Sequence, residues 1–218
     1  MILEAKNIHK SYGDLKVLKG VNFSIDKNEI VSIVGASGAG KSTLMHIIGT
    51  LDTPDLGTLD ILGNNIVNYN SNQIASFRNK EIGFVFQFHN LLPEFTALEN
   101  VCIPGYIANS NSKEIIKRGE EVLEILGLAA RQHHKPSELS GGEQQRVAVA
   151  RALINNPSIV FADEPSGNLD SKNADELHQL FFKLRDEFDQ TFVIVTHNNQ
   201  LADMADRKLE MLDGLVIN

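Results

Sequence analysis

Four short apolar runs constrain the fold of this chain more than any other feature of its sequence. They lack the alternation of apolar and polar residues that marks a sheet with one wet face, so each fits a strand buried on both faces of a parallel sheet. The runs are Ile30 to Val34, Ile82 to Phe86, Ile159 to Ala162 and Thr191 to Val195. Helical patterns fill the gaps and predict an α/β fold, with helices over Lys41 to Thr50, Ser112 to Leu126, Gly141 to Asn155 and Ser171 to Phe188.

Two smaller parts accompany this core. Extended segments at Ile2 to Lys10 and Leu15 to Asp26, joined by a turn, indicate an antiparallel β part, to which a β region at 57–62 and 65–67 belongs. About residues 91–139 carry helical periodicity without a buried strand, which predicts a helical insertion. The loop Asn109 to Ser112 should supply an N-cap within it.

Charge and length limit the classes of function. The chain has 218 residues, 20 of them basic and 28 acidic, and its net charge of −8 disfavours general attraction to nucleic acid or an anionic membrane. The single cysteine, Cys102, excludes an internal disulfide and fits a reducing compartment. The N-terminus lacks the pattern of a secretory signal, and no apolar stretch approaches the roughly 18 residues that cross a bilayer. We therefore expect no direct membrane insertion.

Each apolar run ends in a polar residue or a glycine loop. Gly35 follows the first run, Gln87 the second, Asp163 and Glu164 the third, and His197 lies just after the fourth. In open α/β sheets, ligands bind at the carboxyl ends of the strands. The four segments therefore predict one shared site.

The strongest single motif is the G-x-x-x-x-G-K-S sequence from Gly35 to Ser42, placed between a strand and a helix. Its glycines let backbone N–H groups surround phosphate oxygens, and the following helix contributes its positive end. Lys41 supplies a positive charge to the β and γ phosphates, and the Ser42 hydroxyl suits Mg²⁺. The motif predicts nucleotide-phosphate binding.

The carboxylates Asp163 and Glu164 emerge directly after a buried run. Asp163 suits magnesium, and Glu164 suits polarisation of an attacking water. By themselves such residues more often mark a strand entering a solvated turn, and a lone strand-end histidine such as His197 is more often structural. Beside a phosphate loop the catalytic interpretation dominates, with His197 as a candidate contact for the γ phosphate.

A third motif runs from Leu139 to Arg146. Ser140 and Glu143 have the spacing of a capping box, which starts a helix. Gly141 and Gly142 nevertheless weaken a first helical turn, which calls for a reason to expose backbone N–H groups. A second anion site would supply that reason.

Together these residues resemble the ATP-binding cassette (ABC) ATPases over essentially the whole chain. The glycine loop resembles the Walker A motif, Asp163 with Glu164 the Walker B motif and catalytic glutamate, and Leu139 to Glu143 the ABC signature. Gln87 is similar to the Q-loop glutamine, Ser166 to Asp170 to the D-loop, and His197 to the switch histidine. Tyr12 falls where the family places a ring that stacks on adenine, although a simple turn tyrosine is the alternative.

The resemblance implies a single P-loop NTPase domain of ABC-ATPase fold over residues 1–218. Its nucleotide-binding core, with the antiparallel β subdomain, would span 1–90 and 140–218, and the helical subdomain about 91–139. ATP and Mg²⁺ would be the cofactors. The implied catalytic residues are Glu164, His197, Lys41 and Gln87. The implied metal ligands are Ser42, Gln87 and Asp163. The implied ATP-binding residues are Tyr12, Gly35, Ala36, Ser37, Gly38, Ala39, Gly40, Lys41, Ser42 and Thr43.

The resemblance also implies partners. Two cassettes would form a head-to-tail homodimer, in which Ser140, Gly141, Gly142 and Glu143 of one chain cap the ATP held by the other; Asp170 would act in the D-loop. ATP-driven closure would work on integral membrane permease subunits, with the chain peripheral on the cytoplasmic face of the inner membrane and no nucleic acid involved.

Within the family, Phe86 to Val101 and Glu164 to Asp170 resemble the group of lipoprotein-releasing (LolD-like), macrolide-export-type and cell-division-type ATPases. Leu91 to Thr96 favours the lipoprotein-releasing branch. Ser166 stands where threonine is expected in that group. A regulatory ATPase of the cell-division type, or the ATPase of another exporter, is the alternative.

Overall fold

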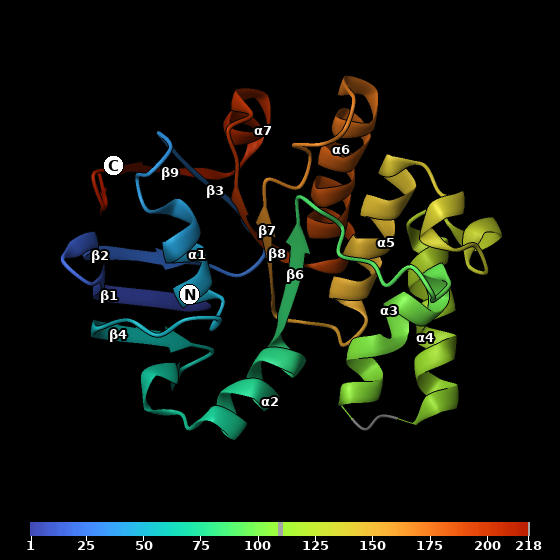
Figure 1. Ribbon diagram of the computed structural model, residues 1–218, viewed down its shortest axis with the longest axis horizontal. Helices are drawn as coiled ribbons and strands as arrows, with labels where there is room; N and C mark the ends of the chain where they lie inside the picture. Colours follow the sequence, from blue (N-terminus) through green and yellow to red (C-terminus); the bar gives the residue numbers. More distant parts are fainter. Residues whose placement is uncertain (109–110, 218) are drawn as a thin grey trace. The chain divides into compact units, whose positions relative to one another are not determined.

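The computed structural model describes residues 1–108 and 111–217, and Figure 1 shows its α/β composition. The chain divides into two compact units. The first comprises residues 1–78 together with those from 185 onward, and the second comprises residues 79–184.

The first unit contains an antiparallel sheet with the strand order β2-β1-β4-β5. Its strands are β1 (Leu3–Tyr12), β2 (Leu15–Ile25), β4 (Leu56–Ile61) and β5 (Asn64–Asn65). β1 pairs antiparallel with β2, as the sequence predicts, and on its other side it pairs antiparallel with β4. The prediction of a strand over 65–67 is wrong beyond Asn65, because Ile66–Asn68 forms a 3-10 turn that buries Ile66. The Tyr69 N–H donates to the Ile66 carbonyl and ends this turn.

The same unit holds the parallel strands β3 (Ile30–Gly35), β8 (Thr191–Val195) and β9 (Arg207–Leu212), with the short β10 (Leu215–Val216) antiparallel to β9. Helices α1 (Lys41–Ile48) and α7 (Asn199–Met204) accompany them. β9 was not predicted. It is a half-buried strand whose charged residues alternate with buried Leu209 and Met211, so it has no continuous apolar run.

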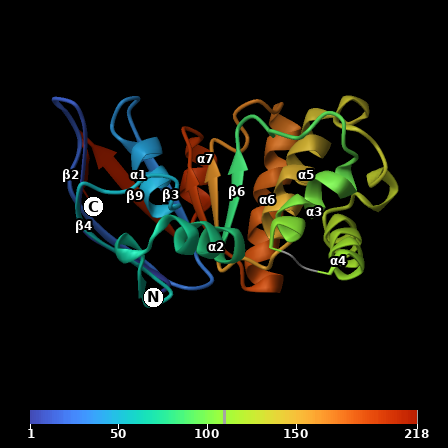
Figure 2. The ribbon, with the colours of Figure 1, turned by 60° about the horizontal axis from the view of Figure 1, so that its bottom comes forward.

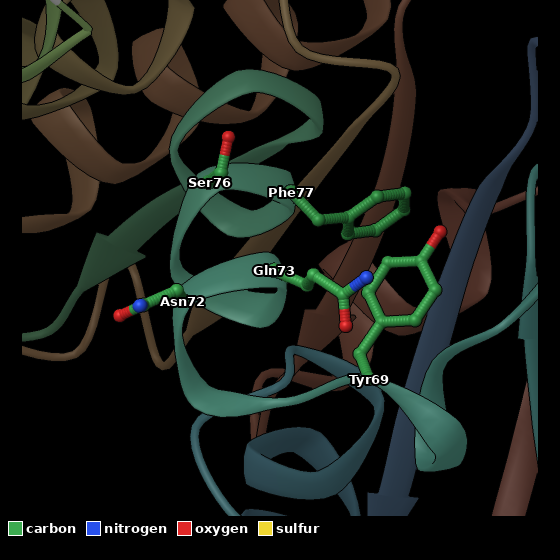
Figure 3. Close-up of a pocket in the computed structure, with 5 residues that line it drawn as sticks. All are labelled: Tyr69, Asn72, Gln73, Ser76 and Phe77. Atoms are coloured by element: carbon green, nitrogen blue, oxygen red, sulfur yellow. The ribbon is translucent and has the colours of Figure 1, made fainter.

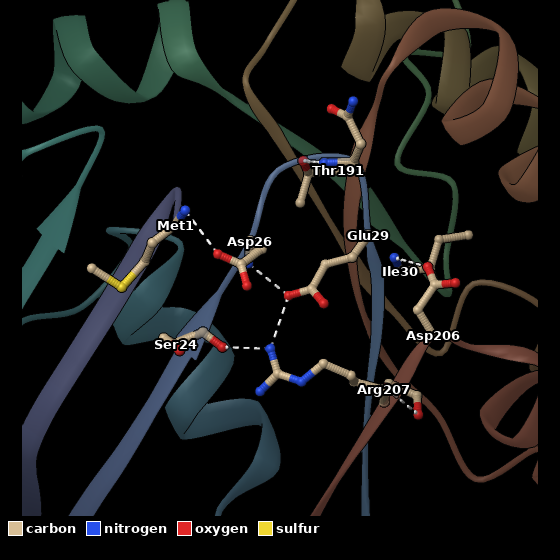
Figure 4. Close-up of polar contacts among 10 residues, drawn as sticks. Met1, Ser24, Asp26, Glu29, Ile30, Thr191, Asp206 and Arg207 are labelled. Carbon is tan, nitrogen blue, oxygen red and sulfur yellow. Dashed lines mark hydrogen bonds and ion pairs between the residues drawn. The ribbon is translucent and has the colours of Figure 1, made fainter.

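Hydrogen bonds and ion pairs hold the chain at the entry to β3 (Figure 4). Asp206 accepts the Ile30 backbone N–H at 2.8 Å and a guanidinium N–H of Arg185 at 2.7 Å. Arg207 donates to Glu29 at 3.0 Å and to the Ser24 carbonyl at 3.1 Å. The contacts therefore join the ends of several chain segments at the start of the strand that leads to the glycine loop.

Helix α2 (Ser71–Glu81) was also not predicted, because none of its residues is buried and it has no apolar stripe to recognise. Tyr69 meets Phe77 edge to face at a centroid distance of 5.9 Å, and both rings line a shallow hollow with polar side chains of α2 (Figure 3). An exposed polar helix of this kind carries little sequence signal.

The second unit contains the parallel pair β6 (Ile82–Phe86) and β7 (Ile159–Asp163). Its helices are α3 (Ala97–Ile107), α4 (Ser112–Ile125), α5 (Gly141–Leu153) and most of α6 (Ser171–Phe188), whose residues 185–188 belong to the first unit. It also has 3-10 turns at Ala129–Arg131 and Pro136–Glu138. Asn111 caps α4 by accepting the Lys113 N–H at 3.0 Å, whereas Asn109 and Ser110 lie outside the described residues.

Helices α3, α4 and α5 pack side by side (Figure 2). A methyl group on Gly119 would lie 2.8 Å from Leu98 and 2.9 Å from the Cys102 sulfur, so the absence of a side chain there permits the close approach of α3 and α4. Cys102 is fully buried, as expected of a core residue. Over the described part of the chain, no helix combines the length and the apolar character needed to span a membrane.

Candidate functional site

The glycine loop of the first unit joins β3 to α1. Gly38 and Gly40 have φ angles of +81° and +100°, a region that favours glycine. Gly40 is the N-cap of α1 and supplies no side-chain cap, so the first helical turn relies on other partners for its N–H groups. Ala36, Ser37 and Gly38 form an exposed tip, and Ser42 is exposed at the start of the helix. The arrangement is the one that binds phosphate at a helix N-terminus.

Lys41 lies inside this loop. Its side chain is buried, and Nζ donates to the carbonyl oxygens of Gly35 at 2.9 Å and Ala36 at 3.0 Å. These carbonyls hold the ammonium group at the end of β3. The positive charge is therefore fixed beside the loop that would receive the phosphates.

Tyr12, at the end of β1, is half exposed and contacts the residues around α1. Its hydroxyl donates to Asp52 Oδ2 at 2.8 Å, and this bond raises the pKa of the phenol, while a hydrogen bond with Thr43 acts in the opposite direction. Lys10 Nζ lies 5.4 Å from the ring centroid. The ring is thus held near α1 with much of its surface open to solvent.

His197 follows β8 in the same unit. β3 and β8 are parallel, with Ile33 opposite Val195, and the Thr196 N–H donates to the Ile33 carbonyl at 3.2 Å. Gly35 and His197 lie two residues further along these strands. The strand register thus brings His197, which is exposed, to the beginning of the glycine loop.

A similar register operates in the second unit. β6 and β7 are parallel with Phe86 opposite Asp163, so Gln87 and Glu164 follow one residue further on neighbouring strands. Glu164 has φ +46°, uncommon for a residue other than glycine, and its carbonyl accepts the Gly167 N–H at 3.0 Å in the turn that follows. The left-handed backbone reverses the chain directly after the strand and positions the carboxylate at its end. Backbone strain of this kind concentrates at functional sites.

Gln87 contacts the turn that follows β7. Its Nε2 donates to Asn168 Oδ1 at 3.1 Å, and Asn168 Nδ2 donates to the Gln87 carbonyl at 3.3 Å. Asn168 lies within the segment identified as a D-loop, but sequence reasoning assigned it no role. The spacing of Gln87 and Asn168 in the chain gives no sign of their contact.

The second glycine motif begins α5, with Ser140 as the N-cap. The Ser140 hydroxyl accepts the Glu143 N–H at 3.3 Å, and Glu143 accepts the Ser140 N–H at 2.8 Å, which confirms the predicted capping box. The bond from the Ser140 N–H lowers the pKa of Glu143, and Arg131 lies 3.1 Å from its carboxylate. Ser140 and Gly141 are exposed, so this end of the helix is open to a ligand.

The two glycines of the motif differ in their surroundings. A methyl group on Gly142 would lie 2.3 Å from Asn173 Oδ1, whereas one on Gly141 would meet only Leu169, at 3.7 Å. Gly142 therefore has a packing reason to lack a side chain, and Gly141 does not. A ligand is therefore needed to explain the glycine only at position 141.

Asp170 and its neighbours connect the D-loop segment to α6. Asp170 accepts the Asn173 backbone N–H at 2.9 Å and the Asn173 side-chain N–H at 2.7 Å, and the backbone bond lowers the pKa of Asp170. Ser166, the residue that departs from the expected threonine, is buried with its hydroxyl 3.0 Å from His178 Nε2. Asn173 and His178 lie outside every motif, and only the folded structure reveals their contacts.

Helix α5 also holds the segment that contains Gln87. Arg151 donates to the carbonyls of His89 at 2.7 Å and Asn90 at 2.6 Å, and Gln145 donates to the Phe86 carbonyl at 3.2 Å. Gln145 is fully buried. The helix that starts with the glycine motif is thus bonded to the backbone on both sides of Gln87.

The profile of the ABC transporter family matches residues 18–167, more than half of the chain. This chain belongs to the ABC transporter family. A "Lipoprotein-releasing system ATP-binding protein LolD" of Cytophaga hutchinsonii is 61% identical over 216 residues, 99% of each chain. A protein of the same description from Porphyromonas gingivalis is 59% identical over 218 residues, the full length of both.

Solved ABC cassettes have the same fold. The dimeric ATP-binding cassette MJ0796, in a post-hydrolysis state bound to ADP and Pi, superposes with a TM-score of 0.89 at 42% identity, over 100% of this chain and 97% of that one. The predicted ABC-ATPase fold class is therefore confirmed. The chain is an ABC-type ATPase that binds ATP.

Proposed function

We propose that this ABC ATPase drives the release of lipoproteins from the inner membrane through separate membrane-protein subunits. The observation that carries the proposal is the identity of 61% and 59%, over essentially the full length, with two proteins described as ATP-binding proteins of a lipoprotein-releasing system. Among the interpretations considered from the sequence, these relatives favour lipoprotein release over cell-division signalling or macrolide export.

The first unit would bind the nucleotide. The backbone N–H groups from Gly35 to Gly40 would surround the phosphates, and Lys41, already held at the loop by two carbonyls, would neutralise the β and γ phosphates. The exposed ring of Tyr12 would stack on the adenine. His197, next to the start of the loop in the β3–β8 register, would contact the γ phosphate.

The oxygen donors Ser42, Gln87 and Asp163 would hold Mg²⁺. Hydroxyl, amide and carboxylate oxygens are the ligands that this hard cation prefers, so the donor set fits the metal. Bound Mg²⁺ would neutralise charge on the phosphates as the bond breaks. Glu164, directly after Asp163, would orient the attacking water and accept its proton.

The glycine motif of α5 would act in a second chain of a homodimer. Ser140 and Gly141 are exposed at a capped helix N-terminus, a favourable place for an anion. The residues Ser140, Gly141, Gly142 and Glu143 of one chain would complete the ATP site of the other, with Asp170 supporting the D-loop. The dimeric form of the MJ0796 cassette supports this arrangement.

A surface of the second unit would contact the membrane subunits. Phe88, Leu92 and Phe95, between Gln87 and α3, have exposed fractions of 68%, 43% and 42%. Neighbouring exposed apolar residues of this kind mark interaction surfaces. Docking there would hold the ATPase as a peripheral protein on the cytoplasmic face of the inner membrane, and Gln87 would report nucleotide state to the docked partner.

The substitution Glu164→Gln tests the catalytic assignment. The amide cannot accept the proton of the water, so ATP should still bind while turnover falls by about 100-fold or more. ATP-dependent dimers should then persist on size exclusion. A variant that hydrolyses ATP at the wild-type rate would remove Glu164 from this role.

Mixed dimers test the composite site. Gly141→Asp places a negative charge against the partner's γ phosphate, so this variant and Lys41→Ala should each be inactive alone. A mixture contains dimers with one intact composite site and should regain activity.

The transport assignment is tested by co-purifying the membrane partner and measuring ATP-dependent lipoprotein release from proteoliposomes, with Glu164→Gln as control. An active ATPase that releases no lipoprotein with its own partner would contradict the proposal.

A further inference from the structure

Asn168 and Gln87 form a reciprocal pair of hydrogen bonds in the second unit. Gln87 Nε2 donates to Asn168 Oδ1 at 3.1 Å, and Asn168 Nδ2 returns a bond to the Gln87 backbone carbonyl at 3.3 Å. One residue follows β6, and the other lies in the turn between β7 and α6. A single asparagine therefore contacts both the backbone and the side chain of Gln87.

The chemistry of the pair determines which end of each amide faces the other residue. A backbone carbonyl only accepts hydrogen bonds, so the nitrogen of the Asn168 amide must face it. The Asn168 oxygen is then directed to the Gln87 side chain, where it can bond only to the nitrogen end of that amide. Reversing either amide would place two donors or two acceptors together.

The Gln87 side chain also lies close against Gly167. A methyl group on Gly167 would lie 2.9 Å from Gln87 Nε2 and 3.2 Å from Cδ. Gly167 has no positive φ, so alanine is compatible with its backbone. The missing side chain leaves the space that the Gln87 amide occupies.

We propose that Asn168 is a positioning residue for the metal site: by engaging the nitrogen end of the Gln87 amide, it presents the oxygen end to Mg²⁺. This inference rests on the proposed function, because it takes Gln87 as a metal ligand. The amide nitrogen of glutamine carries two hydrogens and cannot ligate a hard cation, so only one of the two amide orientations is productive. Asn168 selects that orientation before the metal binds.

The test measures Mn²⁺ affinity rather than turnover. Mn²⁺ binding is followed by electron paramagnetic resonance on the full chain saturated with a non-hydrolysable ATP analogue. Asn168→Ala should weaken Mn²⁺ binding by about 2- to 10-fold, because the freed glutamine must be ordered again when the metal binds. Gly167→Ala should shift the affinity in the same direction by displacing the amide. Asn72→Ala, an exposed asparagine on α2 outside the motifs, should not change it.

A double-mutant cycle distinguishes positioning from a general structural effect. In a Gln87→Ala background, Asn168→Ala should have no further effect on Mn²⁺ affinity, and analogue binding in EDTA should be unchanged throughout. An unchanged Mn²⁺ affinity in Asn168→Ala, or an equal loss with and without Gln87, would overturn the inference while leaving the proposed function intact. A wild-type chain that binds no Mn²⁺ with the analogue would instead contradict the proposed function itself.

Discussion

Gly141 and Gly142 offer a matched pair for testing which glycine of the ABC signature the fold itself requires. A methyl group on Gly142 would lie 2.3 Å from Asn173 Oδ1 and 2.8 Å from its Cγ, whereas the nearest atom to one on Gly141 is Leu169 Cδ2 at 3.7 Å. Asn173 is not free to turn aside, since its Nδ2 donates to Asp170 at 2.7 Å. Substitution by alanine should therefore affect the two positions differently.

The magnitude follows from this difference. Both glycines lie in the first turn of α5, so alanine gains the same helix propensity at each, at most about 1 kcal/mol. Inserting a methyl group into an occupied space costs about 1–3 kcal/mol. The free energy of unfolding of Gly142→Ala should therefore be lower than that of Gly141→Ala by about 1–3 kcal/mol.

Urea unfolding followed by circular dichroism measures the difference, provided that the m-value is unchanged between variants. Replacing Asn173 by alanine removes the two closest atoms and leaves only its Cβ, 3.2 Å from the added methyl group. In that background most of the difference between Gly142→Ala and Gly141→Ala should therefore disappear. Two single variants of equal stability would refute the steric argument. So would a Gly142→Ala defect that remains undiminished after Asn173→Ala.

Three further predictions concern stability and pH. Asp206→Ala removes the acceptor of the Ile30 N–H and of Arg185, and should lower the free energy of unfolding measured in urea titrations by about 1–2 kcal/mol. Asp206→Asn keeps one oxygen acceptor, so it should lower the free energy of unfolding by less. Burial raises the pKa of the Cys102 thiol from 9.0 to about 11, so the native state keeps a proton that the unfolded chain releases first. The free energy of unfolding should therefore fall as pH rises from 9 to 11, and this fall should be smaller in Cys102→Ala. Burial lowers the pKa of His178 from 6.5, so the unfolded chain takes up the proton first as the pH falls. The free energy of unfolding should therefore fall as pH drops below 6.5, and His178→Gln should remove this part of the pH dependence.

Strands buried on both faces were predictable because each consists of a continuous apolar run in the sequence. The strands Ile82–Phe86 and Thr191–Val195 match their predicted bounds, and the other two extend by one residue. The sequence does not predict β9, because only alternate residues of this strand are buried. It does not predict α2, because this helix buries none of its residues. In each case the missing signal was burial, the physical property on which the predictions depended.

Motif residues were predictable for a different reason. A phosphate loop restricts residue type strictly, so Gly40 and Lys41 are recognisable without any knowledge of their neighbours. Asn168 and Asn173 carry no such restriction, because an asparagine amide bonds to whatever the fold brings near it. Their partners depend on how the turn after β7 approaches β6 and α5, which no local pattern specifies.

That turn, together with the first turn of α6 that follows it, links two parts of the site that the sequence treats as separate motifs. Asn168 bonds to Gln87, Asn173 packs on Gly142 and bonds to Asp170, and these contacts come from residues only five apart. A shift of the turn must therefore move the metal-ligand candidate and the signature glycine together. Substitutions at Asn168 and Asn173 should accordingly combine non-additively in ATP turnover, because both act through the position of one short segment.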